Sequence, residues 1–65
     1  MAKRVNYIVV APTGRLNVRE RPSLDARILY QLPYGAKVKI DGKTEAAEGW
    51  KAIEGGGFVM KCYLK

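Results

Sequence analysis

The sequence lacks the residues on which most small catalytic and metal sites depend. Histidine is absent from the 65 residues, and serine and cysteine occur once each, as Ser23 and Cys62. These absences exclude Ser-His-Asp and Cys-His catalytic groups, zinc sites built from cysteine and histidine, and any disulfide within the chain. The acids Glu45, Glu48 and Glu54 lie in or beside expected loops, without the paired carboxylate that a glycosidase needs. We therefore expect no catalytic residue, no metal site and no cofactor.

Long hydrophobic runs are also missing. The longest apolar run, residues 7–11, has five residues, whereas a membrane-spanning helix needs about 20. Residues 1–4 are basic like the start of an export signal, but Pro12 and Gly14 interrupt the apolar stretch behind them. We expect no membrane contact and no signal peptide. A complete chain would then be cytoplasmic, whereas a domain excised from a longer exported protein would lie in the cell wall or outside the cell.

Positive charge is in clear excess. Twelve Lys and Arg against six Asp and Glu give a net charge of +6, which attracts anionic partners such as nucleic acid, cell-wall polymers or acidic lipids. Solubility alone explains such a charge equally well. The bases that could share one face with Tyr30 and Tyr34 are Arg15, Arg19, Arg21, Arg27, Lys37 and Lys39. Acids are dispersed among these bases, so a nucleic-acid surface is the weaker alternative to a solvated exterior.

Proline and glycine recur every five to ten residues, which suits short strands joined by turns and leaves almost no room for a helix. Alternation of polar and apolar residues directs Leu16 and Val18 inward, and likewise Val38 and Ile40. Such a short chain favours a closed or nearly closed barrel of five to seven antiparallel strands. The strands are predicted over residues 5–10, 15–19, 28–32, 37–41, 50–53 and 57–60.

An ordered set of motifs runs through residues 16–64. The motifs are Leu16-Asn17-Val18-Arg19, Pro22-Ser23, Gly35, Gly49-Trp50, Gly57-Phe58-Val59 and Tyr63-Leu64. Together they resemble the bacterial SH3 (SH3b, SH3_3-like) family. Residues 1–15 would add an N-terminal strand and turn to the same domain, so that residues 1–65 form one domain. The resemblance implies an all-β, small SH3-like barrel.

The same resemblance implies a non-catalytic module that binds peptidoglycan peptides and so targets a linked or partner hydrolase to the cell wall. The alternative is an intracellular or phage-encoded module that binds a peptide of another protein. In either case we expect a monomer. The sequence departs from the family pattern at Arg21, where glycine is common, at Tyr30, where a small residue is usual, and at Phe58, where tryptophan is more frequent.

Trp50 is the first candidate ligand-binding residue. It lies three positions before Ile53 on one expected strand, so alternation sends the two side chains to opposite faces. Ile53 then belongs to the core, and Trp50 lies outside or at the barrel edge as the anchor of a groove. The structural alternative is that Trp50 only covers the open end of the barrel.

The other candidate ligand-binding residues are Tyr34, Tyr30, Arg21 and Phe58. Tyr34 is expected to be exposed in a turn, and Tyr30 to be partly buried beside Ile28 and Leu32. Three further residues are expected to be structural. We expect Asn17 to fix a turn, Arg19 to hold loop carbonyl groups or Glu20, and Cys62 to be a small packed side chain.

Overall fold

The computed structural model describes residues 5–44 and 46–65, and this part of the chain is built from short strands. The strands are β1 (Asn6–Ile8), β2 (Arg15–Arg19), β3 (Ile28–Pro33), β4 (Lys37–Lys39), β5 (Trp50–Ala52) and β6 (Phe58–Met60). A short 3₁₀ helix, η1 (Lys61–Tyr63), follows β6. Each expected strand is present: β2 has the predicted bounds, β3 is one residue longer, and the other four are shorter by one to three residues. Among the described residues, no helix is long and apolar enough to cross a membrane.

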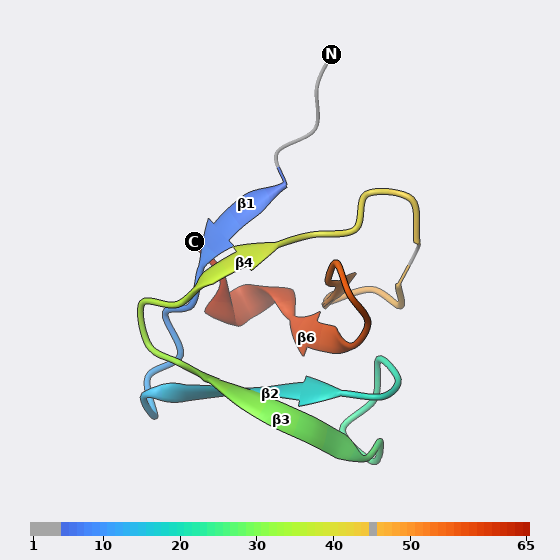
Figure 1. The fold of residues 1–65 in the computed structure, drawn as a ribbon. Helices are drawn as coiled ribbons and strands as arrows, with labels where there is room; N and C mark the ends of the chain where they lie inside the picture. The colour runs from blue at the N-terminus through green and yellow to red at the C-terminus, as the bar shows by residue number, and fades with distance from the viewer. Residues whose placement is uncertain (1–4, 45) are drawn as a thin grey trace.

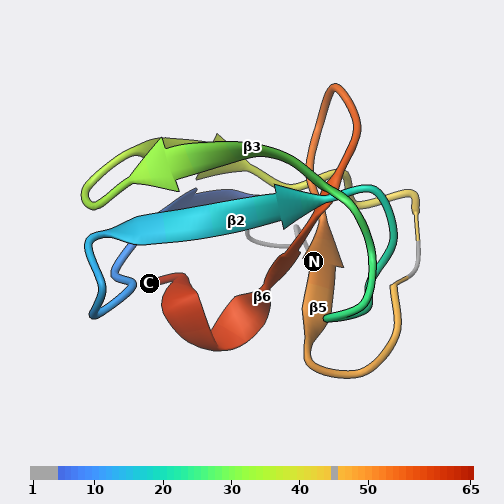
Figure 2. The same ribbon diagram turned by 90° about the horizontal axis from the view of Figure 1, so that it is seen from below.

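The strands form two sheets that face each other (Figure 1). One sheet has the order β3-β2-β6-β5 and the other pairs β1 with β4, and all pairings are antiparallel. Two bridges join the sheets, one between Val9 and Leu64 and one between Ile40 and Ile53. Seen from below, β5 and β6 run across the direction of β2 and β3 and connect the two layers (Figure 2). The result is a small SH3-like barrel, as predicted.

The core lies between the two sheets. Val9, Val18 and Val59 come from different parts of the chain, and each is completely buried. The remaining members of the core cluster are Ala11, Leu16, Val38, Ile40 and Ile53. The predicted inward positions on β2 and around β4 are therefore confirmed, and so is the core position of Ile53. Strict alternation nevertheless fails at the end of β5, because Ala52 is buried as well.

The hairpin between β5 and β6 presses against β2 at Gly57. This glycine has a φ of +105°, in the region that other residues avoid. A Cβ atom at this position would collide with Cγ1 of Val18, which is itself buried. Only glycine fits at this point, so Gly57 fixes how closely the hairpin approaches the core.

The loop between β2 and β3 is held by Arg19. Its guanidinium donates hydrogen bonds to the carbonyl oxygens of Leu24 and Ala26, each over 3.0 Å. This confirms the expected role of Arg19. Asn17 behaves differently from the expectation: its Oδ1 accepts a hydrogen bond of 2.8 Å from Gln31 across the β2–β3 pair. Asn17 therefore links two strands and fixes no turn, because it lies in the middle of β2.

Cys62 is exposed, so the expectation of a packed side chain was wrong. The cysteine lies in η1, whose three residues are all outside the fully buried core. A 3₁₀ turn sends successive side chains in different directions, and in η1 it is Tyr63 that packs against the core cluster. Leu64, directly after η1, then pairs with Val9 and completes the barrel.

Candidate functional site

Trp50 is the first residue of β5 and lies half-buried at the edge of the barrel. Its partner across the sheet is Met60 on β6, and its backbone N–H donates to the carbonyl oxygen of Ala47 over 3.0 Å. This bond closes the turn that leads into β5. Trp50 lines two hollows in the surface.

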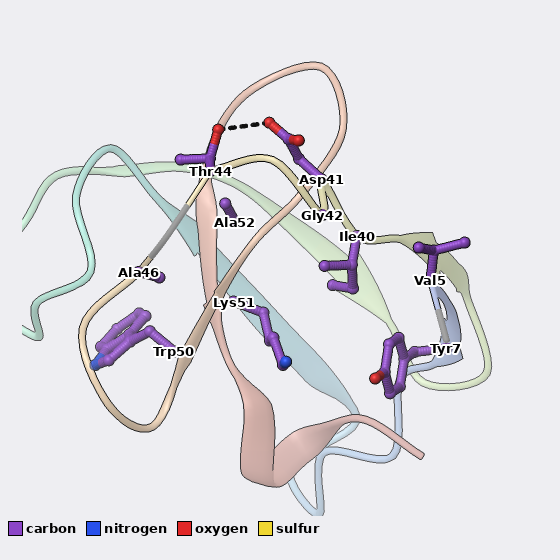
Figure 3. A pocket seen from close by; sticks show the side chains of 10 residues that line it. All are labelled: Val5, Tyr7, Ile40, Asp41, Gly42, Thr44, Ala46, Trp50, Lys51 and Ala52. Carbon is purple, nitrogen blue, oxygen red and sulfur yellow. Dashed lines mark hydrogen bonds between the residues drawn. The ribbon is translucent and has the colours of Figure 1, made fainter. Parts of the chain in front are cut away.

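The first hollow, here called the Tyr7–Trp50 hollow, has a volume of about 480 Å³. The rings of Tyr7 and Trp50 lie on opposite sides of it, and the Lys51 side chain lies between them (Figure 3). Apolar side chains and a polar rim complete the lining with Val5, Ile40, Asp41, Gly42, Thr44, Ala46 and Ala52. Two aromatic walls and a central cation suit an extended ligand that carries negative charge.

Asp41 forms the rim of this hollow and is occupied by its own loop. Its carboxylate accepts a hydrogen bond of 2.6 Å from the Thr44 hydroxyl and one of 2.9 Å from the Lys43 N–H. These two bonds, that from Thr44 first, hold the pKa of the Asp41 carboxyl below its usual value. Asp41 therefore fixes the turn that bounds the hollow and is a positioning residue.

The second hollow, here called the Leu24–Trp50 hollow, has a volume of about 440 Å³. Its apolar lining includes Leu24, Met60 and Tyr63, and its polar rim includes Arg15. Leu24 is 65% exposed, yet its backbone carbonyl is fixed by the bond from Arg19. The Arg19 contact thus sets one wall of a surface hollow as well as the path of the loop.

The predicted site residues do not come together. Trp50 lines both hollows, but Tyr34 is 62% exposed in the turn after β3 and lines neither. Tyr30 is 47% exposed, more open than its strand face indicated, and lines a separate shallow hollow with Lys37 and Lys39. Arg21 is exposed in the β2–β3 loop, and Phe58 is half-buried on β6; both lie outside the two hollows.

Sequence reasoning missed the aromatic partners that Trp50 has in the fold. Tyr7 reaches the first hollow because β1 pairs with β4, with Tyr7 opposite Val38. Tyr63 reaches the second hollow because η1 turns the chain back after β6. Both placements depend on contacts between residues far apart in the sequence, so no local pattern indicated them. The only available signal was the presence of aromatic residues in a chain with few of them.

Of the acidic residues considered for catalysis, Glu54 pairs with Lys39 through a contact of 3.5 Å between Oε2 and Nζ. Glu45 lies outside the described residues. Within the described ranges, no three His, Cys, Asp or Glu side chains gather in a way that could hold a metal ion.

Comparison with known proteins agrees with this architecture. The family model for the bacterial SH3 domain matches residues 14–61, most of the chain. Domains of that family are in general non-catalytic binding modules for peptide or protein ligands. Comparisons with curated proteins and with solved structures found no match.

Proposed function

The chain belongs to the bacterial SH3 family, and we propose that it is a non-catalytic module that binds peptidoglycan peptides and keeps a linked or partner hydrolase on its substrate. The observation that carries the proposal is the position of Trp50, which lines two hollows and whose ring lies across one of them from the ring of Tyr7. Residues 1–65 act as one domain in this proposal.

The chemistry of the surface suits a peptide with carboxylate groups. Rigid aromatic rings provide contact area at a low cost in conformational entropy. Lys51 in the first hollow and Arg15 in the second supply positive charge beside those rings. The net charge of +6 raises the encounter rate with anionic wall polymers.

Binding by one such surface is expected to be weak, because the hollows are shallow and the contact area is small. Weak binding is sufficient when the module is linked to a hydrolase or held by a partner. Once the hydrolase is on the wall, the module binds next to it at a high effective concentration. Weak wall attachment also lets a hydrolase move between sites. The absence of histidine and the occupied carboxylates of Asp41 and Glu54 support a role in binding alone.

The test is a pelleting assay with purified peptidoglycan sacculi. We expect the wild-type protein to pellet with the sacculi and the Trp50→Ala variant to stay largely in the supernatant. Tyr34→Ala is the matched control, because it also removes an aromatic ring but lies outside both hollows. It should pellet like the wild type; if it does not, the site extends to the turn after β3.

Full recovery of the wild-type protein in the supernatant would remove the wall-binding proposal. The intracellular alternative, a peptide of another protein, would then take its place at the same surface. Binding of a fluorescent oligonucleotide, measured at low and high salt, tests the nucleic-acid alternative. Affinity that is present at low salt and falls steeply with salt would support it, because phosphate contacts release counterions.

A further inference from the structure

The strand β3 lies at one end of its sheet, where Figure 2 shows it along the border beside β2. In the part of the chain that the structure describes, β2 is the only strand that pairs with it. An unpaired strand edge offers its backbone N–H and C=O groups to another extended chain, and monomeric proteins usually protect such an edge with charged side chains. The six residues of β3, Ile28–Pro33, include no charged residue.

Three successive apolar side chains of β3 are exposed. Ile28 and Leu29 are each 45% exposed, and Tyr30 is 47% exposed. Successive side chains alternate between the two faces of a strand, so β3 is open to solvent on both faces. With Tyr34, four of the six large apolar side chains that are exposed among the described residues lie on β3 or directly after it. A continuous apolar surface of this kind marks an interaction site.

The hydrogen bonds to β2 define which backbone groups of β3 point outward. The Tyr34 N–H donates to the Gly14 carbonyl over 2.9 Å. Alternate residues of an antiparallel strand bond to the same partner strand, so Leu32 and Tyr30 also direct their N–H and C=O groups toward β2. Gln31, which lies between them, therefore directs its N–H and its C=O outward.

Leu29 adds an outward acceptor to this edge. The N–H of Tyr30 faces β2, and the C=O of the same peptide group points to the opposite side, because the peptide bond is trans. This C=O belongs to Leu29. In residues 5–44 and 46–65, neither the Leu29 C=O nor the backbone groups of Gln31 have a hydrogen-bond partner. Both residues are exposed, so a second strand can reach them.

The spacing of these groups suits pairing of β3 with the same strand of a second copy. In an antiparallel pair around a two-fold axis at Tyr30, the Gln31 N–H of each copy meets the Leu29 C=O of the other. The two Tyr30 side chains then lie directly opposite each other, in a pair where strands are close and aromatic contacts stabilise a sheet.

Charge agrees with this occupant. A charged peptide would find no opposite charge on β3 itself, whereas a second β3 is an uncharged, apolar strand. Each copy carries a net charge of +6, so an interface between two copies has to keep bases apart. In the register above, Arg27 lies opposite Pro33 of the second copy, so no two bases face each other along the paired strands.

We propose that two copies of the chain form a symmetric dimer by antiparallel pairing of their β3 strands, in place of the monomer expected from the sequence. The pairing joins two four-stranded sheets into one, and assembly stops at two because both copies use the same edge. A six-residue strand covers less than the roughly 800 Å² per partner of a standard interface, so the dimer is weak. β3 lines neither Trp50 hollow. If the proposed function holds, the dimer therefore binds the wall through two copies of its site, with increased avidity.

Sedimentation equilibrium of the wild-type protein from about 10 μM to about 1 mM tests the dimer. The average mass should rise with concentration toward twice that of one chain. Over the same range, hydrogen exchange followed by nuclear magnetic resonance should show growing protection of the Gln31 amide. The amides of Tyr30 and Leu32, which face β2, should change little. A constant monomer mass, or a dimer without protection of Gln31, would overturn the inference.

Charges introduced at Tyr30 test the two-fold register. Tyr30→Lys and Tyr30→Glu each place two like charges opposite each other, so each variant alone should stay monomeric. An equimolar mixture of the two variants should form a heterodimer, because opposite charges then face each other. Ile8→Lys and Ile8→Glu are the controls, since Ile8 is apolar and 46% exposed but lies on β1; each should dimerise like the wild type. Dimerisation of Tyr30→Lys alone, or a mixture that stays monomeric, would contradict this register.

Sacculus pelleting of the same proteins separates the dimer from the proposed function. Tyr30→Lys should still pellet, because each copy retains its Trp50 hollows, but less than the wild type, because avidity is lost. Dimerisation of a wild-type protein that does not pellet keeps the dimer and removes wall binding. Pelleting of a wild-type protein that stays monomeric keeps wall binding and removes the dimer.

Discussion

The two ends of β5 have opposite surroundings. Directly after its C-terminal end, Ile53 bridges to Ile40 on one side, donates its N–H to the Gly57 carbonyl on the other, and is 5% exposed. Three residues earlier, Trp50 is half-buried beside an edge that the chain after β4 has left. The turn at Asp41 makes the difference, because it ends the pairing with β5. One short strand thus contributes to the core at one end and to a binding surface at the other.

The stability of the protein should be most sensitive to volume added near Ile53, at the buried C-terminal end of β5. Gly57→Ala places a methyl group against Val18 in a backbone conformation that alanine avoids. Overpacking and backbone strain together should destabilise the protein by about 2–6 kcal/mol. Gly56→Ala is the control, since Gly56 has a similar φ of +107° but open space around it. Urea denaturation should show the larger loss for Gly57→Ala; equal losses would mean that the contact with Val18 is unimportant.

Removing volume from the same buried end of β5 should lower the free energy of unfolding slightly less than Gly57→Ala does. Ile53→Ala leaves a cavity among Val18, Val59 and Ile40, all of which are buried. We expect a loss of about 2–5 kcal/mol in the free energy of unfolding, a large part of what such a small domain has. Thermal melts measure this loss, and a melting temperature near that of the wild type would show that Ile53 contributes little to the core.

Arg19 on β2 holds the β2–β3 loop, and Leu24 of that loop lines the Leu24–Trp50 hollow. Arg19→Met keeps the aliphatic stem but removes two hydrogen bonds to loop carbonyls, which should cost about 1–3 kcal/mol. Arg15→Met is the control, because Arg15 is exposed and makes one long bond of 3.4 Å to Gln31. Chemical denaturation should separate the two variants; identical midpoints would argue against a structural role for Arg19.

The smallest loss of stability is expected at the turn held by the Asp41 carboxylate, where pairing with β5 ends. The pKa of Asp41 is lowered in the folded protein, mainly by the Thr44 hydroxyl. Its contribution to stability is therefore present above the ordinary aspartate pKa of about 3.9 and is lost as the pH falls through the lowered pKa. Asp41→Asn should be less stable than the wild type near neutral pH, and the difference should shrink in acid. Chemical denaturation of both proteins at neutral and at acid pH measures this difference.

Much of the barrel could be predicted because it depends on local patterns. Alternation indicated the inward faces at Leu16, Val18, Val38 and Ile40, and all four are buried. The position of Arg19 beside a loop indicated its contacts with carbonyl groups, which are present. These features need only neighbouring residues and the periodicity of a strand.

The candidate site could be predicted only in part, because it is assembled from distant segments. The sequence singled out Trp50 but grouped it with Tyr30 and Tyr34, whereas pairing of β1 with β4 and the turn of η1 bring Tyr7 and Tyr63 beside it. The open outer edge of β3 is equally invisible in a sequence. It depends on which strands become neighbours, and among the described strands β3 pairs with β2 alone.

Stability and sacculus binding of Trp50→Ala, measured on one preparation beside Ile53→Ala, test most directly the claim that β5 separates folding from binding. We predict that Trp50→Ala melts close to the wild type and loses binding, because a groove residue of this kind contributes about 2 kcal/mol or more to affinity. Ile53→Ala should lose stability and bind through the fraction that stays folded. If Trp50→Ala unfolds at least as readily as Ile53→Ala, Trp50 is a core residue and the account is contradicted.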